Sequence, residues 1–448
     1  MLRDDGRVEW RRYRAMVEWA GNGDAAVRSA ALEAVLAELD PLLRQEGLAD
    51  LFAHTLRDTL ESAIKPAPDG SVFVVTGDIP AMWLRDSTGQ VMPYLRFCAG
   101  DAVLRQVVRG VILRQARAIL RDPYANAFTF DSSGAAYHAG DETERRPGVW
   151  ERKWEVDSLC WPLKLLRGYV AATDDTAIYA DPDVRAALAM ILTTFETERE
   201  HATRSTYAFR RMVPGLAHHD TTTSHPAALT GMIWGAFRPS DDGCVYNYHI
   251  PSQMFAVVEM NELARAFDAI YQLPRWAERA RGLAESIELG IQRHGVVDHG
   301  MQGRIYAYEV DGLGHYHLMD DANLPSLLGL PELGYCTASD PLYLNTRRFV
   351  LSQANPYYYE GPLASGVGSP HTPAPFVWPL ALIVQALTAT DAEEVRALLR
   401  VLCDAAQLGR GALHESFNPA DPARYTRDWF GWANALFAEL VLRAYYDG

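Results

Sequence analysis

The chain has 448 residues, 48% of them hydrophobic and 22% charged, and its formal net charge is −15 at pH 7. This apolar content excludes a disordered or low-complexity chain, because such sequences have too few side chains to bury in a core. The acidic balance argues against nucleic acid or an anionic membrane as the main partner, and it permits neutral ligands such as sugars.

Cysteine usage and hydropathy indicate where in the cell the protein is expected. The five cysteines lie far apart and form no CxxC pair, so no disulfide framework is expected. No stretch approaches the roughly 20 apolar residues that span a bilayer. The first residues are highly charged and have no apolar signal-peptide region. We therefore expect a cytoplasmic protein that is not bound to a membrane, and the sequence makes no prediction of its oligomeric state.

Helical periodicity dominates, with apolar residues at three- and four-residue steps. The first stripe runs from Leu32 to Leu39, with Asp24 as a candidate N-cap. Further helices are predicted over 101–121, 184–199, 252–270, 275–293, 376–389 and 391–408, and a last helix after Thr426 and Asp428. Strand patterns occur only at 71–76 and 304–310, without the βαβ alternation of a parallel-sheet enzyme.

The chain shows no linker of biased composition and no internal repeat, so residues 1–448 are predicted to form a single domain. About a dozen helices would fit an all-α toroid of six helical hairpins, an (α/α)6 barrel, with short β segments in its loops. We favour this architecture over two separate helical bundles. In such a toroid, loops gather at one end and can line a funnel.

The loops between the predicted helices are rich in Trp, His, Asp and Asn, which suits a sugar ligand: aromatic rings cover its C–H face, and polar groups bind its hydroxyls. The segment 76–87 contains Trp83, Arg85 and Asp86 at the start of a helix, and a second run of tryptophans and charges occupies 150–157. Either segment alone could instead be an ordinary helix start with surface ion pairs.

Two segments carry candidate acid–base carboxyls. Asp241 and Asp242 are adjacent between Arg238 and a run of aromatic residues, where burial or a neighbouring charge could raise a carboxyl pKa. The same four residues, Ser-Asp-Asp-Gly, also suit a plain turn. Glu415 lies in a loop before the last helix, where a carboxylate is commonly solvated.

Two further loops supply polar candidates. Asp321 belongs to a Met-Asp-Asp-Ala-Asn run that could cap a helix or bind hydroxyls, and His371 lies in a Gly/Pro-rich loop where it could be a surface histidine. The sequence has neither an HExxH zinc motif nor an acidic calcium-binding loop, so no metal and no cofactor are predicted.

Together these segments resemble glycoside hydrolase family 125, the exo-acting α-1,6-mannosidases. The matching runs follow the family's order and are TGDIPAMWLRDS (76–87), WERKWEVDSLCWP (150–162), FRPSDD (237–242), MDDANLPSLL (319–328), GVGSPHTP (366–373), HESF (414–417) and WFGWANALF (429–437). The resemblance implies an (α/α)6 barrel. It also implies metal-independent removal of non-reducing terminal α-1,6-linked mannose, with inversion, from a mannose-containing oligosaccharide.

The family's Asp general acid and Glu general base carry over to this sequence by motif. The base maps onto Glu415, and the acid falls on Asp242 or Asp241, of which we prefer Asp242. Trp83, Arg85, Asp86, Asp321 and His371 are the candidates for holding the terminal mannose. An inverting enzyme needs its two carboxyls roughly 6.5–9.5 Å apart, with a water between base and sugar.

Two other functions remain open from the sequence. One is a different (α/α)-barrel carbohydrate enzyme, either another exo-glycosidase or a polysaccharide lyase, although the acidic charge disfavours an acidic glycan. The other is a glycan-binding protein without catalysis, against which the presence of both carboxylates argues.

Overall fold

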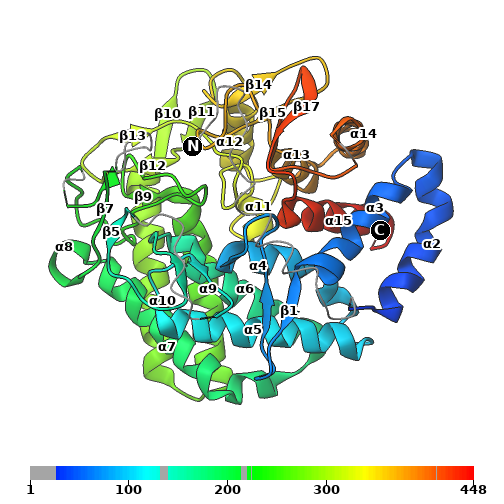
Figure 1. Cartoon of the computed structure of the whole chain (residues 1–448). Helices are drawn as coiled ribbons and strands as arrows, with labels where there is room; N and C mark the ends of the chain where they lie inside the picture. The colour runs from blue at the N-terminus through cyan, green and yellow to red at the C-terminus, as the bar shows by residue number, and fades with distance from the viewer. Residues whose placement is uncertain (1–26, 132–139, 213–218, 223–224, 410, 448) are drawn as a thin grey trace.

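The computed structural model describes residues 27–131, 140–212, 219–222, 225–409 and 411–447 (Figure 1). The candidate cap Asp24 and the charged N-terminal segment lie outside these residues. The first described helix, α2 (Ala30–Glu46), is capped by Ser29, whose hydroxyl accepts a hydrogen bond from the backbone N–H of Leu32 at 3.2 Å.

The described chain is mostly helical. Its other α-helices are α3 (Ala49–Asp58), α4 (Leu84–Val91), α5 (Ala102–Arg121), α6 (Cys160–Thr173), α7 (Pro182–Glu198), α8 (His201–Arg204), α9 (Ile250–Ala269), α10 (Pro274–Gly290), α11 (Leu330–Leu333), α12 (Pro341–Val350), α13 (Pro379–Leu387), α14 (Ala392–Leu408) and α15 (Gly431–Tyr445). The helices predicted from periodicity are confirmed, with ends shifted by a few residues. The last helix begins later than predicted because the preceding residues finish a strand, and Arg427 takes a left-handed turn with φ of 55°.

The strands are short and lie in the connections between helices. They are β1 (Ile64–Pro66), β2 (Val72–Val74), β3 (Met82–Trp83), β4 (Ala127–Phe128), β5 (Glu142–Thr143), β6 (Val149–Glu151), β7 (Phe209–Arg211), β8 (His219–Asp220), β9 (Tyr248–His249), β10 (Val296–His299), β11 (Gly303–Tyr306), β12 (Glu309–Val310), β13 (Tyr316–His317), β14 (Tyr358–Glu360), β15 (Ser365–Val367), β16 (Ser416–Asn418) and β17 (Asp421–Thr426). Every pair among these named strands is antiparallel. The predicted strand at 304–310 is in fact two strands, because the ladder breaks after Tyr306.

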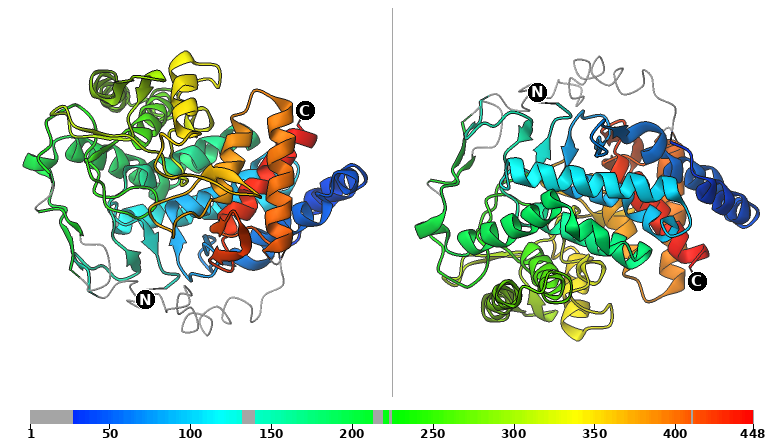
Figure 2. Two further views of the ribbon diagram at one scale, coloured as in Figure 1. Left: turned by 90° about the horizontal axis from the view of Figure 1, so that it is seen from above. Right: turned by 90° about the horizontal axis from the view of Figure 1, so that it is seen from below.

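Helices pack in pairs, and several hairpins lie together at one side of them. α9 packs on α10, α5 on α7, and α13 on α14, while the strand hairpins β10–β11, β14–β15 and β16–β17 lie toward the top of the view in Figure 1, beside α12 and α14. Figure 2 shows α5 and α7 side by side from below. One continuous cluster of buried apolar side chains extends from Leu32 to Leu442.

α15, the last helix, meets the early helices α3 and α4 in the interior. α15 packs against α3, α4 and α13, and the buried carboxylate of Asp58 accepts hydrogen bonds from Trp429 Nε1 at 2.9 Å and Asn434 Nδ2 at 2.8 Å. Asn434 Oδ1 in turn accepts from the backbone N–H of Leu413 at 3.2 Å. A single polar group therefore joins the first helices, the last helix and the loop that leads to Glu415.

The five cysteines carry free thiols, as predicted. Among the helices of the described ranges, none has both the length and the apolar character required to cross a membrane.

Candidate active site

The Asp241–Asp242 doublet lies on a tight hairpin loop. Phe237 and Gly243 pair across its base, and the backbone N–H of Arg238 donates to the carbonyl of Asp242 at 2.7 Å. Asp241 adopts a φ of 68°, a left-handed turn that aspartate tolerates better than most residues. The Ser-Asp-Asp-Gly run is thus a turn, but one whose two carboxylates meet different surroundings.

A buried ion pair anchors this loop. Arg238 donates to both carboxylate oxygens of Glu309 at 2.6 and 3.0 Å, and Glu309 also accepts from the backbone N–H groups of Val245 and Tyr246. Burial opposes the charge of Glu309, yet Arg238 and the hydrogen bonds outweigh burial and hold the pKa of Glu309 well below its usual range. No local sequence pattern points to Glu309, because nothing near residue 309 links it to residue 238.

Asp241 is held among cationic and amide groups. Its Oδ1 accepts from Asn126 Nδ2 at 2.7 Å and lies 3.8 Å from Lys153 Nζ. Burial acts to raise the pKa of Asp241, but the charges of Lys153 and Arg85 prevail and hold it well below the usual value. Asp241 is therefore an ionised group with little reason to hold a proton.

Asp242 has one engaged and one open oxygen. Its Oδ1 lies 3.5 Å from Nδ1 of His371, whereas its Oδ2, although buried, has no hydrogen-bond partner within the described ranges. Burial raises the pKa of Asp242, and the opposing effects of His371, Arg238 and Lys153 leave it below the ordinary value. The free oxygen distinguishes Asp242 from Asp241 as a group able to contact a ligand.

Asp321 connects the loops that carry Asp242 and His371. Its carboxylate accepts from the hydroxyl of Ser240 at 2.7 Å, and its pKa is lowered by Ser369, whose hydroxyl accepts the backbone N–H of His371 at 3.1 Å. Asp321 is almost fully buried. It therefore acts as a support between the two loops, in addition to any contact with a sugar.

Glu415 lies directly before β16 and is 9% exposed. Its Oε1 is 3.7 Å from Nη1 of Arg427, and Arg427 donates through Nε to Asp78 Oδ1 at 2.8 Å. The strand after Glu415 is fixed by reciprocal backbone hydrogen bonds of 2.9 Å between Phe417 and Val377. Glu415 is thus not the solvated loop carboxylate that the sequence left open.

The segment 76–87 forms the wall beside these loops. Arg85 is fully buried and donates to Glu155 at 2.8 Å and to Asp157 at 3.0 Å, so it organises an internal ion network. Asp86, also buried, accepts from the hydroxyl of Thr76. Trp83 packs in a small apolar cluster apart from the main core, and its buried Nε1 lacks a hydrogen-bond partner among the residues described.

His371 links the acidic candidates electrostatically. Burial lowers the pKa of this imidazole, but Asp242, Glu415 and Asp241 together raise it to about 9. Together with the 3.5 Å contact between His371 and Asp242 and the backbone pairing of Val377 with Phe417, this effect places the loops at 237–243, 366–373 and 414–417 near one another. The side chain of His371 remains 37% exposed, so this site is open to solvent.

Acidic groups outnumber cations beneath this site. Arg85 and Lys153 are surrounded by four carboxyls, of which those of Glu151, Glu155 and Asp157 are buried and that of Asp241 is partly exposed. Burial raises the pKa of Glu155 well above its usual value, and burial raises that of Glu151 and of Asp157. The charges of Arg85 and Lys153 oppose this effect of burial.

Several of these residues were not singled out from the sequence. Lys153 and Glu155 lie inside the Trp-rich run at 150–157, so that pattern was a usable signal. No sequence pattern indicated Asn126 or Arg427, because their partners, Asp241 and Glu415, lie more than ten residues away in the chain.

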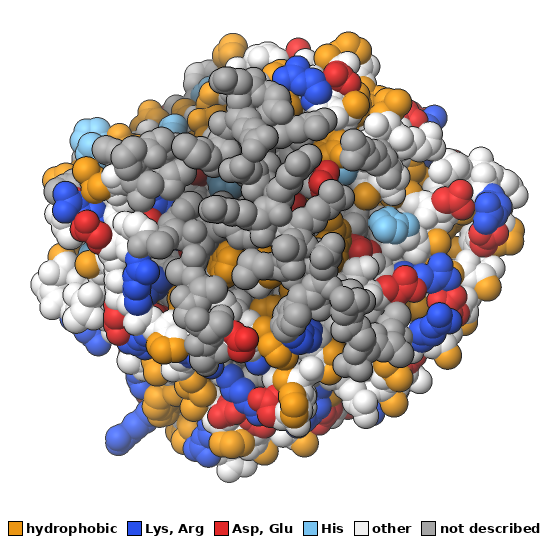
Figure 3. All heavy atoms as spheres, in the orientation of Figure 1, with side chains coloured by type: hydrophobic (Ala, Val, Ile, Leu, Met, Phe, Trp, Pro, Cys, Tyr) orange, Lys and Arg blue, Asp and Glu red, His pale blue; other side chains and the backbone are white. Residues whose placement is uncertain are grey.

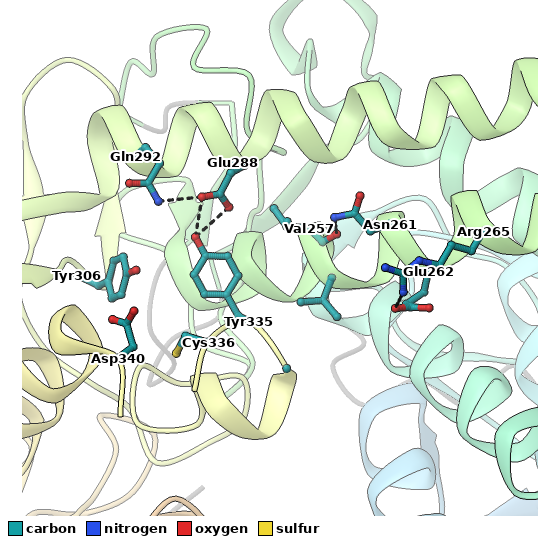
Figure 4. A pocket seen from close by; sticks show the side chains of 12 residues that line it. Val257, Asn261, Glu262, Arg265, Glu288, Gln292, Tyr306, Tyr335, Cys336 and Asp340 are labelled. Atoms are coloured by element: carbon teal, nitrogen blue, oxygen red, sulfur yellow. Dashed lines mark hydrogen bonds and ion pairs between the residues drawn. The ribbon is translucent and has the colours of Figure 1, made fainter. Parts of the chain in front are cut away.

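A separate cleft of about 540 Å³ lies between α9, α10 and residues 334–340 (Figure 4). Its polar side chains satisfy one another, since Tyr335 and Gln292 both donate to Glu288, and it contains none of the candidate residues. In the described ranges, no group of three His, Cys, Asp or Glu side chains could hold a metal ion. On the face shown in Figure 3, acidic and basic described side chains are interspersed.

Comparison with known proteins identifies this arrangement. The model of the family described as metal-independent alpha-mannosidase (GH125) matches residues 45–442. The chain belongs to glycoside hydrolase family 125. It is therefore a glycoside hydrolase of an α-mannosidase family, as the resemblance of its motifs implied.

Two relatives are similar to this family 125 enzyme over most of their lengths. The Meiotically up-regulated gene 157 protein of Schizosaccharomyces pombe is 38% identical over 439 residues, which cover 92% of this chain and 85% of that protein. A metal-independent alpha mannosidase structure from Streptococcus pneumoniae, a non-productive substrate complex with alpha-1,6-mannobiose, is 42% identical with a TM-score of 0.90. That match covers 93% of this chain and 99% of the other.

A more distant likeness concerns the fold alone. A bacterial glucoamylase complexed with acarbose has a TM-score of 0.53 at 12% identity, and the match covers 88% of this chain and 55% of that one.

Proposed function

We propose that this family 125 enzyme is an exo-acting mannosidase that removes non-reducing terminal α-1,6-linked mannose with inversion. One observation carries the proposal: His371 lies 3.5 Å from Asp242 at a solvent-open site, and its pKa is also raised by the charge of Glu415, 173 residues beyond Asp242 in sequence (415 − 242). The α-1,6-mannobiose bound by the Streptococcus pneumoniae relative supports the choice of linkage.

In the proposed reaction, Asp242 is the general acid and Glu415 the general base. Oδ2 of Asp242 gives its proton to the glycosidic oxygen, which leaves with the electron pair of its bond to C1. Glu415 takes a proton from water as the water oxygen bonds to C1 from the opposite face, which inverts the anomeric centre. Both groups then return to their starting state by proton exchange with solvent.

The neighbouring side chains fit supporting roles in this proposal. Arg427 holds Glu415 from one side, and Asp241 remains a carboxylate that can accept from a mannose hydroxyl. Trp83 offers an unused Nε1–H donor beside the site. Arg85, Asp86 and Asp321 are buried, and they contribute to sugar binding chiefly by fixing the groups that touch the sugar. The reaction is proposed to need no cofactor.

We further propose that the paired helices form a single (α/α)6 catalytic domain. The consecutive pairs α2–α3, α9–α10 and α13–α14, and one continuous apolar core, support this topology. The five free thiols are compatible with the cytoplasm as its location.

Proton NMR during hydrolysis of α-1,6-, α-1,2- and α-1,3-mannobiose tests the proposal. We expect rapid release of mannose from the α-1,6 isomer only, with the β-anomer appearing first. First release of the α-anomer would contradict inversion. In a parallel assay on a uronate-containing glycan, an unsaturated product absorbing in the ultraviolet would indicate a lyase. Tight mannobiose binding without mannose release would indicate a glycan-binding protein.

The same assay tests the two carboxyls. We expect Glu415→Gln and Asp242→Asn each to lower turnover of α-1,6-mannobiose by at least about 10²-fold, the usual range for an acid–base group. Circular dichroism should show an unchanged fold. Full activity of Glu415→Gln would remove the proposed base.

A further inference from the structure

His371 has a geometry that a sugar-binding role does not explain. Its Nδ1 faces Oδ1 of Asp242 at 3.5 Å, which leaves Oδ2 as the unpartnered oxygen of that carboxyl. This separation is at the outer limit of hydrogen bonding, as is common for catalytic contacts in structures without substrate. The contact selects one of two otherwise equivalent oxygens.

The backbone around both residues fixes this pairing. Asp321 accepts from Ser240, two residues before Asp242, and is influenced by Ser369, two residues before His371. The loop of His371 is also held at Thr372, whose hydroxyl accepts from Trp378 Nε1 at 2.9 Å. Two independent loops are therefore joined so that the imidazole meets the carboxyl.

We propose that His371 is a positioning residue for the general acid: its Nδ1–H donates to Oδ1 of Asp242 and directs Oδ2 to the glycosidic oxygen. This inference rests on the proposed function of Asp242. It adds no proton to the reaction, because the Nδ1–H bond persists while Oδ2 loses its proton. The imidazolium then faces the carboxylate that the transfer creates.

The charges around the pair determine the expected pH behaviour. His371 faces Asp242, Asp241 and Glu415, while Asp242 also interacts with Arg238, Lys153 and Asp321. A cation beside a carboxyl lowers its pKa. Loss of the imidazolium therefore raises the pKa of Asp242, so the acid stays protonated to higher pH and the basic limb of kcat/KM moves in the alkaline direction.

The experiment compares His371→Leu, which removes the donor, with His371→Asn, whose amide places a neutral donor near the position of Nδ1. Each is assayed on α-1,6-mannobiose and on α-mannosyl fluoride, whose fluoride leaves with little help from an acid. At its own pH optimum, we expect His371→Leu to lose about 10²-fold in kcat/KM on mannobiose and less than about tenfold on the fluoride. His371→Asn should recover part of this loss, and both variants should show the alkaline shift.

Equal losses on the two substrates, or a raised KM with an unmoved basic limb, would overturn the inference in favour of sugar binding. The matched control is His315→Asn, since His315 pairs with Asp311 at 2.6 Å on the exposed turn between β12 and β13. It should leave both activities unchanged. If Asp242→Asn is inactive on mannobiose while His371→Leu behaves as wild type, only this inference fails. A fully active Asp242→Asn would instead contradict the proposed acid.

Discussion

The carboxyls of Asp241 and Asp242 are neighbours in the chain but have different partners. Asp241 is fixed by Asn126 and Lys153, whereas Asp242 pairs with His371 and keeps one oxygen open. The left-handed turn at Asp241 sends the two side chains to different surroundings. This difference favours Asp242 as the proton donor and Asp241 as a permanently charged group.

Leaving-group dependence separates these two roles. We expect Asp242→Asn to lose turnover of α-1,6-mannobiose and to retain much of its turnover of α-mannosyl fluoride, because only the first substrate needs a general acid. Asp241→Asn should lose activity on both substrates by a similar factor. Steady-state kinetics on the four enzyme–substrate pairs provides the check, and the reverse pattern would assign the acid to Asp241.

The pH dependence of wild-type activity follows from the same contacts. His371, Arg238 and Lys153 outweigh burial and lower the pKa of Asp242, so the acid loses its proton as the pH rises through the acidic range. We expect kcat/KM on mannobiose to be highest on the acidic side of neutrality and to fall toward alkaline pH. A profile that is flat through neutrality would contradict this expectation.

At the scale of the elements, close packing between α4 and α15 depends on a glycine. A Cβ built on Gly89 would lie 2.1 Å from Nε1 of the buried Trp432, while a Cβ on Gly282, on the exposed face of α10, would meet nothing within 4 Å. These two helical glycines thus form a natural pair for comparison.

Alanine at the two positions should have opposite effects. Gly282→Ala should raise the free energy of unfolding by about 0.5–1 kcal/mol, because alanine loses less backbone entropy in a helix. Gly89→Ala should lower it by about 1–3 kcal/mol through overpacking against Trp432. Urea unfolding followed by circular dichroism measures both, and a stabilised Gly89→Ala would show that α4 and α15 can separate without cost.

Local sequence patterns predicted the helices better than they predicted which side chains contact one another. The helices from 101–121 to 391–408 followed from apolar periodicity, and Glu415 and Asp242 followed from motifs. Glu309, Asn126 and Arg427 did not, since their importance arises from contacts with distant loops. The N-cap was misassigned to Asp24 because several polar residues precede α2, and only the backbone conformation identifies Ser29.

For the whole molecule, the decisive contact is the one between α3 and α15. Asn434 on α15 donates to the buried Asp58 of α3 and accepts from Leu413, two residues before Glu415. A sequence pattern could not reveal this link, because its partners are 376 residues apart. The same side chain therefore stabilises the fold and helps to position Glu415, the proposed base.

We expect Asn434→Ala to lower the free energy of unfolding by about 1–3 kcal/mol, because it leaves buried polar groups without partners. Burial raises the pKa of Asp58, against the hydrogen bonds of Asn434 and Trp429. The stability contributed by Asp58 is thus present below its unfolded pKa and is lost as the pH rises through the folded pKa, so the variant's deficit should grow with pH. Urea titrations at several pH values measure it.

The control for this variant is Asn261→Ala. Asn261 donates only to the carbonyl of Val257 on its own helix, α9, at 3.0 Å, so its loss should cost less and show no growth with pH. Equal deficits in the two variants would mean that Asn434 does not join α15 to α3 and to the segment before Glu415.

The late position of α15 has a consequence for biosynthesis. A nascent chain displays the Asp241–Asp242 loop well before the segment with Glu415, Arg427 and α15 has been translated, because synthesis proceeds from the N-terminus. Until then α3 and α4 lack the helix that covers them. A premature stop codon anywhere before α15 should therefore yield truncated chains that chaperones bind and proteases degrade. None of these chains should be a partially active mannosidase.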